Sequence, residues 1–481
     1  MPRITRRSFL KTTAVASAAA LLRPRSWAQV TGANSDIRLG LVGFNNRGKD
    51  IIRLDMPTVT DARITALCDV DSAVLDGMAK TFRDQGKEVQ TFSDYRDLLA
   101  KGDIDAVILV TPNHQHALQA VWACQAGKDV YLEKPVCHNI WEGRRIIEAA
   151  DKYKRIIQVG SQCRSSDSLR EAVAWVQAGN LGKIISARGL CYKRRASIGL
   201  TDGPQPVPAT VNYDLWCGPA PLAPMRRTKL HYDWHWQWAY GCGDLGNQGV
   251  HQMDVARWFL GEPALAPRVL TVGGRLGYID DGQTPNTAII VQDYEKAPLI
   301  FEVRGLPTQT GSNAMDKYDG ASIGVIVQCE NGQVVVPDYV SAHAYDKNGQ
   351  VVKDFTGASS HMGNFIAAVR SRKVSDLHAP ISEGFISSSL CHTGNISLRV
   401  GQTQPPDAIR EQIKGNAAMT EAFGRVTEHL AANGLDLVKT PLTLGAALAM
   451  DPKTERFTNS DAANALLTRE YRKPFVVPEK V

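Results

Sequence analysis

The sequence has few cysteines and no recognisable cysteine pattern. Its nine cysteines are scattered over 481 residues, with no CxxC pair and no spacing typical of a zinc site. Because the number is odd, at least one thiol stays free, and we expect no disulfide framework. Internal repeats and low-complexity segments are missing too, which argues against solenoid and fibrous architectures. The remaining composition is that of an ordinary globular chain, long enough for two or three domains with substantial cores.

Long apolar runs are also missing, so no membrane span is expected. The run from Ala14 to Leu22 is too short to cross a bilayer. It follows a basic head and precedes Ser26-Trp27-Ala28, which offers small residues to a signal peptidase. Residues 1–28 are therefore predicted to be an export signal, with an uncleaved N-terminal helix as the alternative. The pattern RRSFLK at residues 6–11 resembles a twin-arginine signal, which exports folded proteins to the periplasm.

A surplus of positive charge is absent from the rest of the chain. The formal net charge is +6, and residues 1–28 hold six basic side chains and no acidic one. The chain that remains after removal of this segment is therefore close to neutral. It lacks the basic excess that binding to nucleic acid requires, and we expect no nucleic-acid partner.

Residues 36–160 carry the pattern of a dinucleotide-binding domain. A short apolar strand at 37–43 leads into a tight turn and a helix, an order that places a helix N-terminus where it can hold a pyrophosphate. Asn45 replaces the middle glycine of GxGxxG, so a purely structural strand–turn–helix stays open. The next strand ends in Asp69, where a carboxylate can bind ribose hydroxyls and repel a 2′-phosphate, which favours NAD over NADP. The turn residues assigned to the cofactor are Gly43, Asn45, Asn46, Arg47 and Gly48.

Three further strand ends are predicted to meet at the same crevice. Strands at 105–110, 129–132 and 156–160 each stop at polar residues. In doubly wound sheets the carboxyl ends of the strands face the ligand. The cofactor-binding residues predicted at these ends are Thr111, Pro112, Asn113, His116, Glu133, Lys134 and Gln162.

Residues 241–258 hold the second candidate for chemistry. Asn247, His251 and Asp254 are spaced i, i+4 and i+7, which places them on one face of a helix. Glycines before this helix allow a close approach of backbone. A histidine on such a stripe, with an ordinary pKa near neutral, is a candidate for proton transfer. A buried histidine that is merely hydrogen-bonded is the alternative.

The second half also offers candidates for contact with a substrate. A strand at 183–192 is followed by Lys193, Arg194 and Arg195, which either form a solvated loop or contact a polyhydroxylated or acidic molecule. The stretch 230–238 contains three Trp and two His, and such side chains suit a sugar ring, although the alternation also fits a half-buried strand. The substrate-binding residues predicted are Arg164, Tyr192, Trp234, His235, Trp236, Asn247 and His251.

Together these motifs resemble the glucose–fructose oxidoreductase and inositol dehydrogenase family over roughly residues 36–400. The turn at 43–48, Thr-Pro-Asn-His at 111–114, Glu-Lys-Pro at 133–135 and the helix with His251 carry the resemblance. It implies an N-terminal Rossmann domain and, over 161–400, an α/β domain with an open, mostly antiparallel sheet. It also implies that Lys134 contacts the substrate hydroxyl and that His251 exchanges its proton. Hydride transfer in this family needs no metal, so we expect none, although His231, Asp233, His235 and His251 could in principle form a site.

The sequence departs from the family pattern at one position. Many members carry Asp four residues before the histidine, where this chain has Asn247. An amide can orient a ligand but cannot relay a proton. Asp244 either supplies the missing carboxylate or caps the helix.

Three functions stay open at this point. The first is an exported NAD-dependent oxidoreductase that acts on a hydroxyl of a sugar, polyol or glycoside. The second is a nicotinamide-dependent glycosidase with tightly bound NAD, which oxidises, eliminates and returns the hydride. The third is a non-catalytic sugar-binding relative. Residues 401–481 are predicted to be a helical extension for contacts between subunits of a homo-oligomer.

Overall fold

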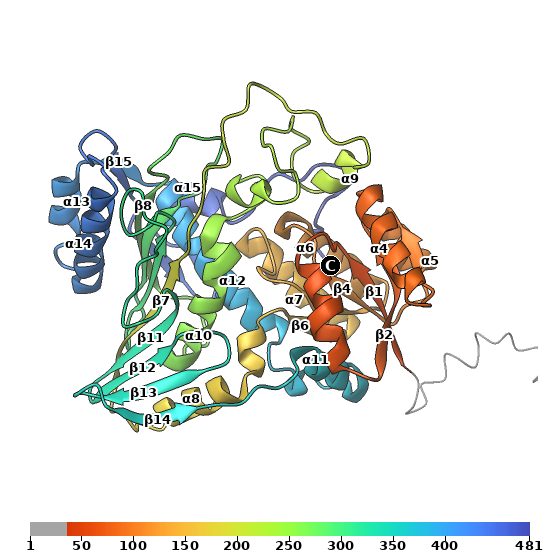
Figure 1. Ribbon diagram of the computed structural model, residues 1–481, viewed down its shortest axis with the longest axis horizontal. Coiled ribbons are helices and arrows are strands. Elements are labelled where there is room, and N and C mark those ends of the chain that lie inside the picture. The colour runs from red at the N-terminus through yellow and green to blue at the C-terminus, as the bar shows by residue number, and fades with distance from the viewer. Residues whose placement is uncertain (1–35) are drawn as a thin grey trace, which may run out of the picture.

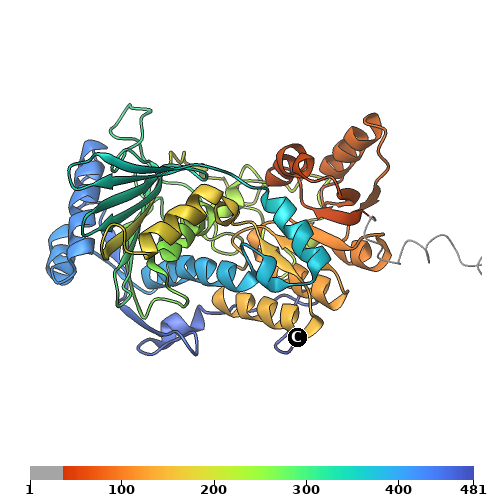
Figure 2. The same ribbon diagram turned by 90° about the horizontal axis from the view of Figure 1, so that it is seen from below.

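The computed structural model describes residues 36–481, so the predicted signal at 1–28 lies outside the described residues. Two sheets lie side by side with helices between and around them (Figures 1 and 2). The first sheet is built from the N-terminal third of the chain, and the second from the remainder.

The first sheet has six parallel strands in the order β3-β2-β1-β4-β5-β6. This is the strand order of a Rossmann fold, whose crevice opens where the order reverses, between β1 and β4. The predicted Rossmann domain is confirmed. The strand β3 was not predicted, because it has only three residues and little buried surface. The strands are β1 (Ile37–Val42), β2 (Ala62–Cys68), β3 (Gln90–Phe92), β4 (Ala106–Leu109), β5 (Asp129–Leu132) and β6 (Ile157–Val159).

Helices cover both faces of this sheet, which explains why β4 and β5 are apolar throughout. One face packs against α5 (Tyr95–Lys101), α6 (Asn113–Gln125) and α7 (Ile140–Tyr153). The other packs against α4 (Ser72–Asp84), whose N-terminus Asp71 caps, and against α11 (His361–Ser371). Phe365 of α11 lies in the same hydrophobic cluster as Leu41 of β1. The core of the nucleotide-binding half is thus completed by a helix from the second half.

The second sheet is mixed and mostly antiparallel, as predicted. Its order is β14-β13-β12-β11-β7-β10-β9-β8-β16-β15, and only the pair of β7 and β10 is parallel. The strands are β7 (Ile184–Tyr192), β8 (Arg268–Gly274), β9 (Thr287–Gln292), β10 (Leu299–Arg304), β11 (Ile323–Cys329), β12 (Gly332–Val336), β13 (Ala342–Asp346), β14 (Val351–Phe355), β15 (Gln402–Gln404), β16 (Leu442–Leu444), β17 (Leu448–Asp451) and β18 (Arg456–Phe457).

Three helices fill the space on the inner face of the second sheet. They are α8 (Asp167–Gln177), α10 (Val250–Leu260) and α12 (Ile381–Arg399). The helix α12 contacts both α10 and α7, so it lies between the two halves of the molecule. A long connection after β7 holds α9 (Tyr213–Cys217) and two short helical turns, η4 (Asp233–Trp236) and η5 (Leu245–Gly249).

Residues 401–481 contain more than the helices that were predicted. The helices are α13 (Pro406–Ile413), α14 (Ala417–Ala432) and α15 (Asp461–Ala465), but β16 and β17 pair with β8 and extend the second sheet. The last residues return to the first sheet, where Phe475 and Val477 are buried in its core. Short apolar strands such as β16 need a partner strand to form, and their sequence carries no signal of that partner.

Candidate active site

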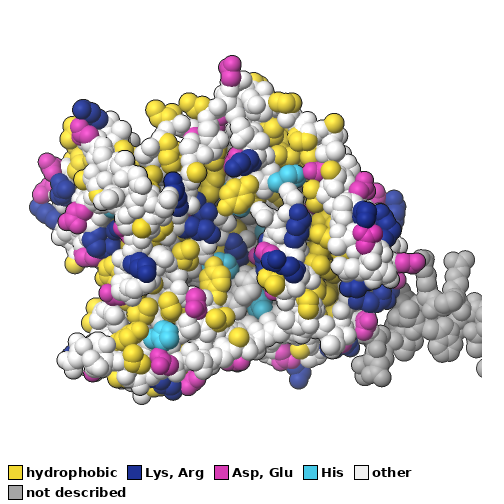
Figure 3. Space-filling model, viewed as in Figure 1, with side chains coloured by type: hydrophobic (Ala, Val, Ile, Leu, Met, Phe, Trp, Pro, Cys, Tyr) yellow, Lys and Arg dark blue, Asp and Glu magenta, His cyan; other side chains and the backbone are white. Residues whose placement is uncertain are grey.

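A cavity of about 660 Å³ lies between the two halves of the molecule. It opens at the carboxyl ends of β1, β2, β4 and β5, where a Rossmann sheet binds its ligand. In the space-filling view, Lys and Arg side chains flank a hollow between the two halves, and His side chains are visible within it (Figure 3). The predicted residues that line it are Gly43, Asn45, Asn46, Arg47, Asp69, Thr111, Pro112, Asn113, His116, Glu133, Lys134, Gln162, Trp234, His235, Asn247 and His251.

The glycine turn allows backbone to approach closely at one end of the cavity. Gly43 has a φ of 76°, and a Cβ there would lie 3.0 Å from the Val110 carbonyl oxygen. Gly48 does not line the cavity; a Cβ on it would lie 2.5 Å from the Gly43 carbonyl oxygen. Gly48 is therefore not placed to contact the cofactor as predicted. It packs against the turn and lets α3 (Arg47–Asp50) begin close to it. Asn46, the N-cap residue of α3, makes no side-chain capping bond.

Two side chains fix the other elements to this turn. Asp69, at the end of β2, accepts a hydrogen bond from the Phe44 amide at 3.3 Å, and burial raises the pKa of its carboxyl group. Arg47 donates from Nε to Glu133 at 3.0 Å and from its terminal nitrogen to Asp55 at 2.6 Å. The turn is thereby tied to the Glu-Lys-Pro segment after β5.

His116 joins the loops after β4 and β5. Its Nδ1 lies 2.7 Å from the Pro135 carbonyl oxygen, and its Nε2 lies 2.7 Å from that of Thr111. Asn113 donates to the Cys242 sulfur at 3.0 Å and so links the first loop to the second half of the chain. Both loops are positioned by these contacts rather than left free.

Lys134 reaches across the cavity to the second half. Its Nζ donates to the main-chain carbonyl oxygen of Asn247 at 2.5 Å. Burial lowers the pKa of Lys134, and the charges of Arg47 and Lys193 lower it further, while Glu133 opposes them. Main-chain oxygen thus binds the ammonium group at the position where many family members have a carboxylate.

His251 lies in the first turn of α10, next to Lys134. Burial, and then the positive charge of Lys134, lower its pKa to about 3, so the imidazole is neutral. This differs from the near-neutral pKa expected from the sequence, because the ring is only 6% exposed. Its Nδ1 has no hydrogen-bond partner within residues 36–481. A neutral ring with an unused nitrogen can accept a proton, although weakly.

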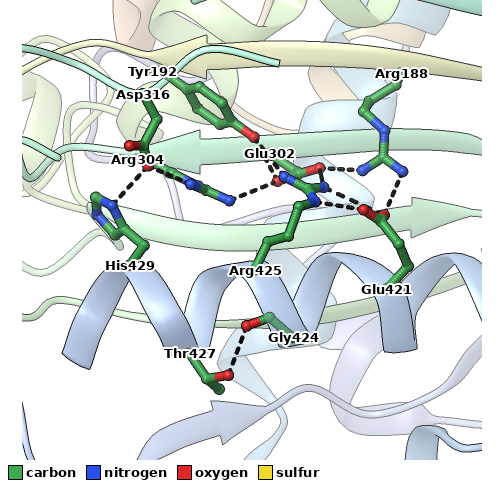
Figure 4. Close-up of polar contacts among 10 residues, drawn as sticks. All are labelled: Arg188, Tyr192, Glu302, Arg304, Asp316, Glu421, Gly424, Arg425, Thr427 and His429. Atoms are coloured by element: carbon green, nitrogen blue, oxygen red, sulfur yellow. Dashed lines mark hydrogen bonds and ion pairs between the residues drawn. The ribbon is translucent and has the colours of Figure 1, made fainter. Parts of the chain in front are cut away.

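Three predicted substrate-binding residues lie outside the cavity lining. Arg164 forms a buried ion pair with Asp254 at 2.8 Å, so neither member of the pair faces the ligand. The Tyr192 hydroxyl donates to Glu302 at 2.7 Å on the face of the sheet that α14 covers (Figure 4). Trp236 is buried against the Arg195 guanidinium, 5.0 Å from its ring centre. The prediction that these three residues bind substrate is therefore wrong, because each side chain contacts other protein groups and does not reach the cavity.

Asp244 neither caps the helix nor replaces the missing carboxylate. It is fully buried and forms an ion pair with Arg195. The stretch 230–238 forms a loop with the helical turn η4 and not a strand. Within it, His231 pairs with Asp71 at 2.9 Å, and His235 stacks on Trp234 with ring centres 3.7 Å apart. Among residues 36–481, no group of three or more His, Cys, Asp or Glu side chains is placed to hold a metal ion.

The fold adds lining residues that the sequence did not single out. Tyr339, from the connection between β12 and β13, lies with its ring centre 5.1 Å from that of His251. Its hydroxyl accepts a hydrogen bond from Gln248 at 2.6 Å. No local pattern marks Tyr339, because only the register of the sheet brings it to the cavity. Cys242 lies within the glycine-rich stretch, which could have indicated it.

Comparison with known proteins agrees with this architecture. Residues 37–161 match the model of an oxidoreductase family with an NAD-binding Rossmann fold, and residues 179–291 match the C-terminal alpha/beta domain of an oxidoreductase family. Residues 3–22 match the twin-arginine translocation signal, which indicates export. Across residues 36–481, no helix combines the length and apolar character needed to cross a membrane.

Curated relatives include sugar-related enzymes. Inositol 2-dehydrogenase 3 of Saccharopolyspora erythraea is 31% identical over 311 residues, which cover 63% of this chain and 73% of that protein. Glycosyl hydrolase family 109 protein 2 of Shewanella sp. (strain ANA-3) is 30% identical over 203 residues, which cover 37% of this chain and 44% of that protein. The match to this second relative therefore spans less than half of its length.

A solved structure shares the fold. The WlbA dehydrogenase from Bordetella pertussis, in complex with NADH and UDP-GlcNAcA, aligns with a TM-score of 0.55 and 20% identity over 75% of this chain and 96% of that chain. With both domain models matched in order and 31% identity over most of one relative, the chain belongs to the Gfo/Idh/MocA family of oxidoreductases.

Proposed function

We propose that the protein is an exported NAD-dependent oxidoreductase that acts on a hydroxyl group of a sugar, polyol or glycoside. The observation that carries this proposal is the convergence of Lys134 and a neutral His251, from opposite halves, at one cavity that also contains the glycine turn and Asp69. Such a pair at the end of a dinucleotide crevice suits removal of a proton from an alcohol.

The residues of the first half fit NAD. The glycine turn at Gly43, which lines the cavity, and the uncapped start of α3 suit a pyrophosphate. Asp69 suits the ribose diol and disfavours the additional phosphate of NADP. When bound, NAD supplies a hydride acceptor at its nicotinamide ring.

The side chains of the second half then act on the substrate hydroxyl. Lys134 donates a hydrogen bond to the oxygen and stabilises the negative charge that develops there. His251 takes the proton at a ring nitrogen, and the low pKa of this ring makes the contribution of Lys134 necessary. The carbonyl of Asn247 holds the ammonium in position. With NAD bound, its nicotinamide would accept the hydride from the carbon that bears this oxygen, and the alcohol would become a carbonyl group.

A redox-neutral glycosidase is the second candidate, and the cover over the nucleotide end of the cavity favours it. The connection after β7 is tied to the end of β2 by backbone hydrogen bonds from Asn212 to Val70 and from Ser72 to Thr210, each 2.9 Å long. A cofactor held beneath this connection would be retained between turnovers, which favours reoxidation in place. Oxidation of a ring hydroxyl would acidify the neighbouring C–H. A base would remove that proton while the glycosidic oxygen leaves as an alcohol, water would add to the double bond that forms, and return of the hydride would restore the hydroxyl, so no net oxidation would occur. The relative named as a family 109 glycosyl hydrolase agrees with this candidate.

One experiment separates the candidates. The purified protein is examined for bound nicotinamide and is then mixed with a panel of sugars, polyols and aryl glycosides. Stoichiometric accumulation of reduced nicotinamide supports the dehydrogenase. A transient reduced form with cleaved glycoside and no net NADH supports the glycosidase. Absence of bound cofactor, together with no response to added NAD, refutes both enzymes and leaves a non-catalytic binding protein.

A further inference from the structure

A second cavity, of about 200 Å³, adjoins the first. Asp55, Gln162 and Tyr339 line both cavities, so the two are continuous at these side chains. The second cavity lies between the helical turn η2 (Met56–Thr58) and the residues that lead into α11. Nothing in the proposed reaction uses this space.

Its lining is rich in hydroxyl groups. Thr58, Ser166, Ser359 and Ser360 all contribute to it. The Thr58 and Ser360 hydroxyl oxygens lie 2.6 Å apart, and Ser359 donates to the Ser165 carbonyl oxygen at 2.5 Å. The hydrogens of these hydroxyl groups are used within the protein, but their remaining lone pairs can accept hydrogen bonds from the hydroxyl groups of a ligand.

Tyr339 supplies an aromatic surface where the two cavities meet. Its side chain is 39% exposed although its hydroxyl is held by Gln248. Exposed aromatic rings beside hydroxyl groups suit the C–H face and the polar edge of a sugar. Asp55, also in the lining, is paired with Arg47 at 2.6 Å and so brings no uncompensated charge to this space.

We propose that the second cavity is a subsite for the neighbouring ring of a glycoside whose reacting ring lies beside Lys134 and His251. The inference rests on the proposed function and names its substrate as a molecule of at least two rings. The volume equals that of about six or seven water molecules at roughly 30 Å³ each, which matches one six-membered ring with its hydroxyls. Tyr339, 5.1 Å from the His251 ring, would lie under the linkage between the two rings.

Ala358 allows a direct test because it lines this cavity, does not line the first, and is exposed. Ala358→Trp fills the space without removing any side-chain polar contact. Thr356→Trp, two residues earlier on the same exposed segment and outside the lining, is the matched control. Thermal melting of both variants checks that each is folded.

Binding and turnover are measured on NAD-loaded protein with pairs of ligands, a methyl monosaccharide glycoside and the disaccharide that carries the same reacting ring. We expect the wild type and Thr356→Trp to bind at least one disaccharide about tenfold or more tightly than its one-ring partner. Ala358→Trp should lose that preference and keep its affinity for the one-ring ligand. The same pattern is expected in kcat/KM.

Equal affinity of the wild type for the one-ring and two-ring members of every pair would overturn the subsite. So would an equal loss of both affinities in Ala358→Trp. Absence of turnover with the binding preference intact would instead refute the proposed function and leave the subsite supported. The two failures are thus distinguishable by calorimetry on the same samples.

Discussion

At the scale of single residues, the charge of Lys134 helps to keep His251 neutral. The positive charge of Lys134 is the second cause, after burial, of the low pKa of His251. Because that pKa is about 3, His251 stays neutral at mildly acidic and neutral pH, and no loss of activity there should come from its protonation. Lys134 must remain charged to stabilise an alkoxide. We therefore expect the loss of activity at alkaline pH to come from deprotonation of Lys134.

The pH profile gives the first prediction. The pKa of Lys134 lies below its usual 10.5, so the ammonium is lost, and activity falls, as pH rises through a value lower than that. Asn247→Asp adds a carboxylate beside Lys134, favours the charged form, and should move the alkaline limb upward by about one pH unit. Steady-state kcat measured against pH checks this. If the Asn247→Asp variant is active but its alkaline limb stays at the wild-type pH, residue 247 does not act on Lys134 through charge.

At the scale of elements, the connection after β7 lines the cavity at the end where we propose that NAD binds. His231 pairs with Asp71 at 2.9 Å and lines the cavity. We predict that His231→Ala speeds release of bound NAD by about two- to fivefold, the equivalent of a pair worth up to ~1 kcal/mol. The rate is measured by stopped-flow fluorescence on protein loaded with NADH, because only the reduced nicotinamide fluoresces. His343→Ala is the control, because His343 forms a similar pair with Asp354, at 2.6 Å, outside the cavity lining. Equal release rates in both variants would contradict the proposal that the connection after β7 retains the cofactor.

The helix α14 is held to the second sheet by a buried charge cluster (Figure 4). Glu302 is fully buried and receives bonds from Arg188, Arg425 and Tyr192. Glu302→Gln leaves buried arginines without their carboxylate, and we predict a loss of about 3 kcal/mol in the free energy of unfolding. Glu421→Gln, at a side chain that is 43% exposed, should cost less than about 1 kcal/mol. Denaturant titration compares the two, and a similar small cost for both would mean that α14 is held by apolar contacts alone.

At the scale of the whole molecule, the two ends of the described chain share one core. Phe475 is 5% exposed and packs among residues of β4, β5 and α6. Phe475→Ala is predicted to cost about 3 kcal/mol and to weaken NAD binding, since the lost packing lies beneath the sheet that presents the cavity. Val476→Ala is the control, because Val476 is 40% exposed. Unfolding curves with and without NAD measure both effects; matching curves for the two variants would contradict the prediction.

The sequence alone determined the elements that local chemistry specifies. The apolar strands, the turn from Gly43, the Glu-Lys-Pro segment and the helix with His251 were predicted because each depends on residues close together in the chain. Parallel topology then gathers the strand ends, so most of the residues predicted for the site do line the cavity.

The direction of side chains, and the contacts between segments far apart in the sequence, depend on the packing of the two halves. Tyr192 and Arg164 were assigned to the substrate, yet strand alternation turns one to α14 and an ion pair holds the other. Tyr339 and α11 reach the first half from more than 200 residues away in the sequence. The contact between Lys134 and the carbonyl of Asn247 has no sequence signal, because every residue has a carbonyl group and only the packing of the two halves selects one.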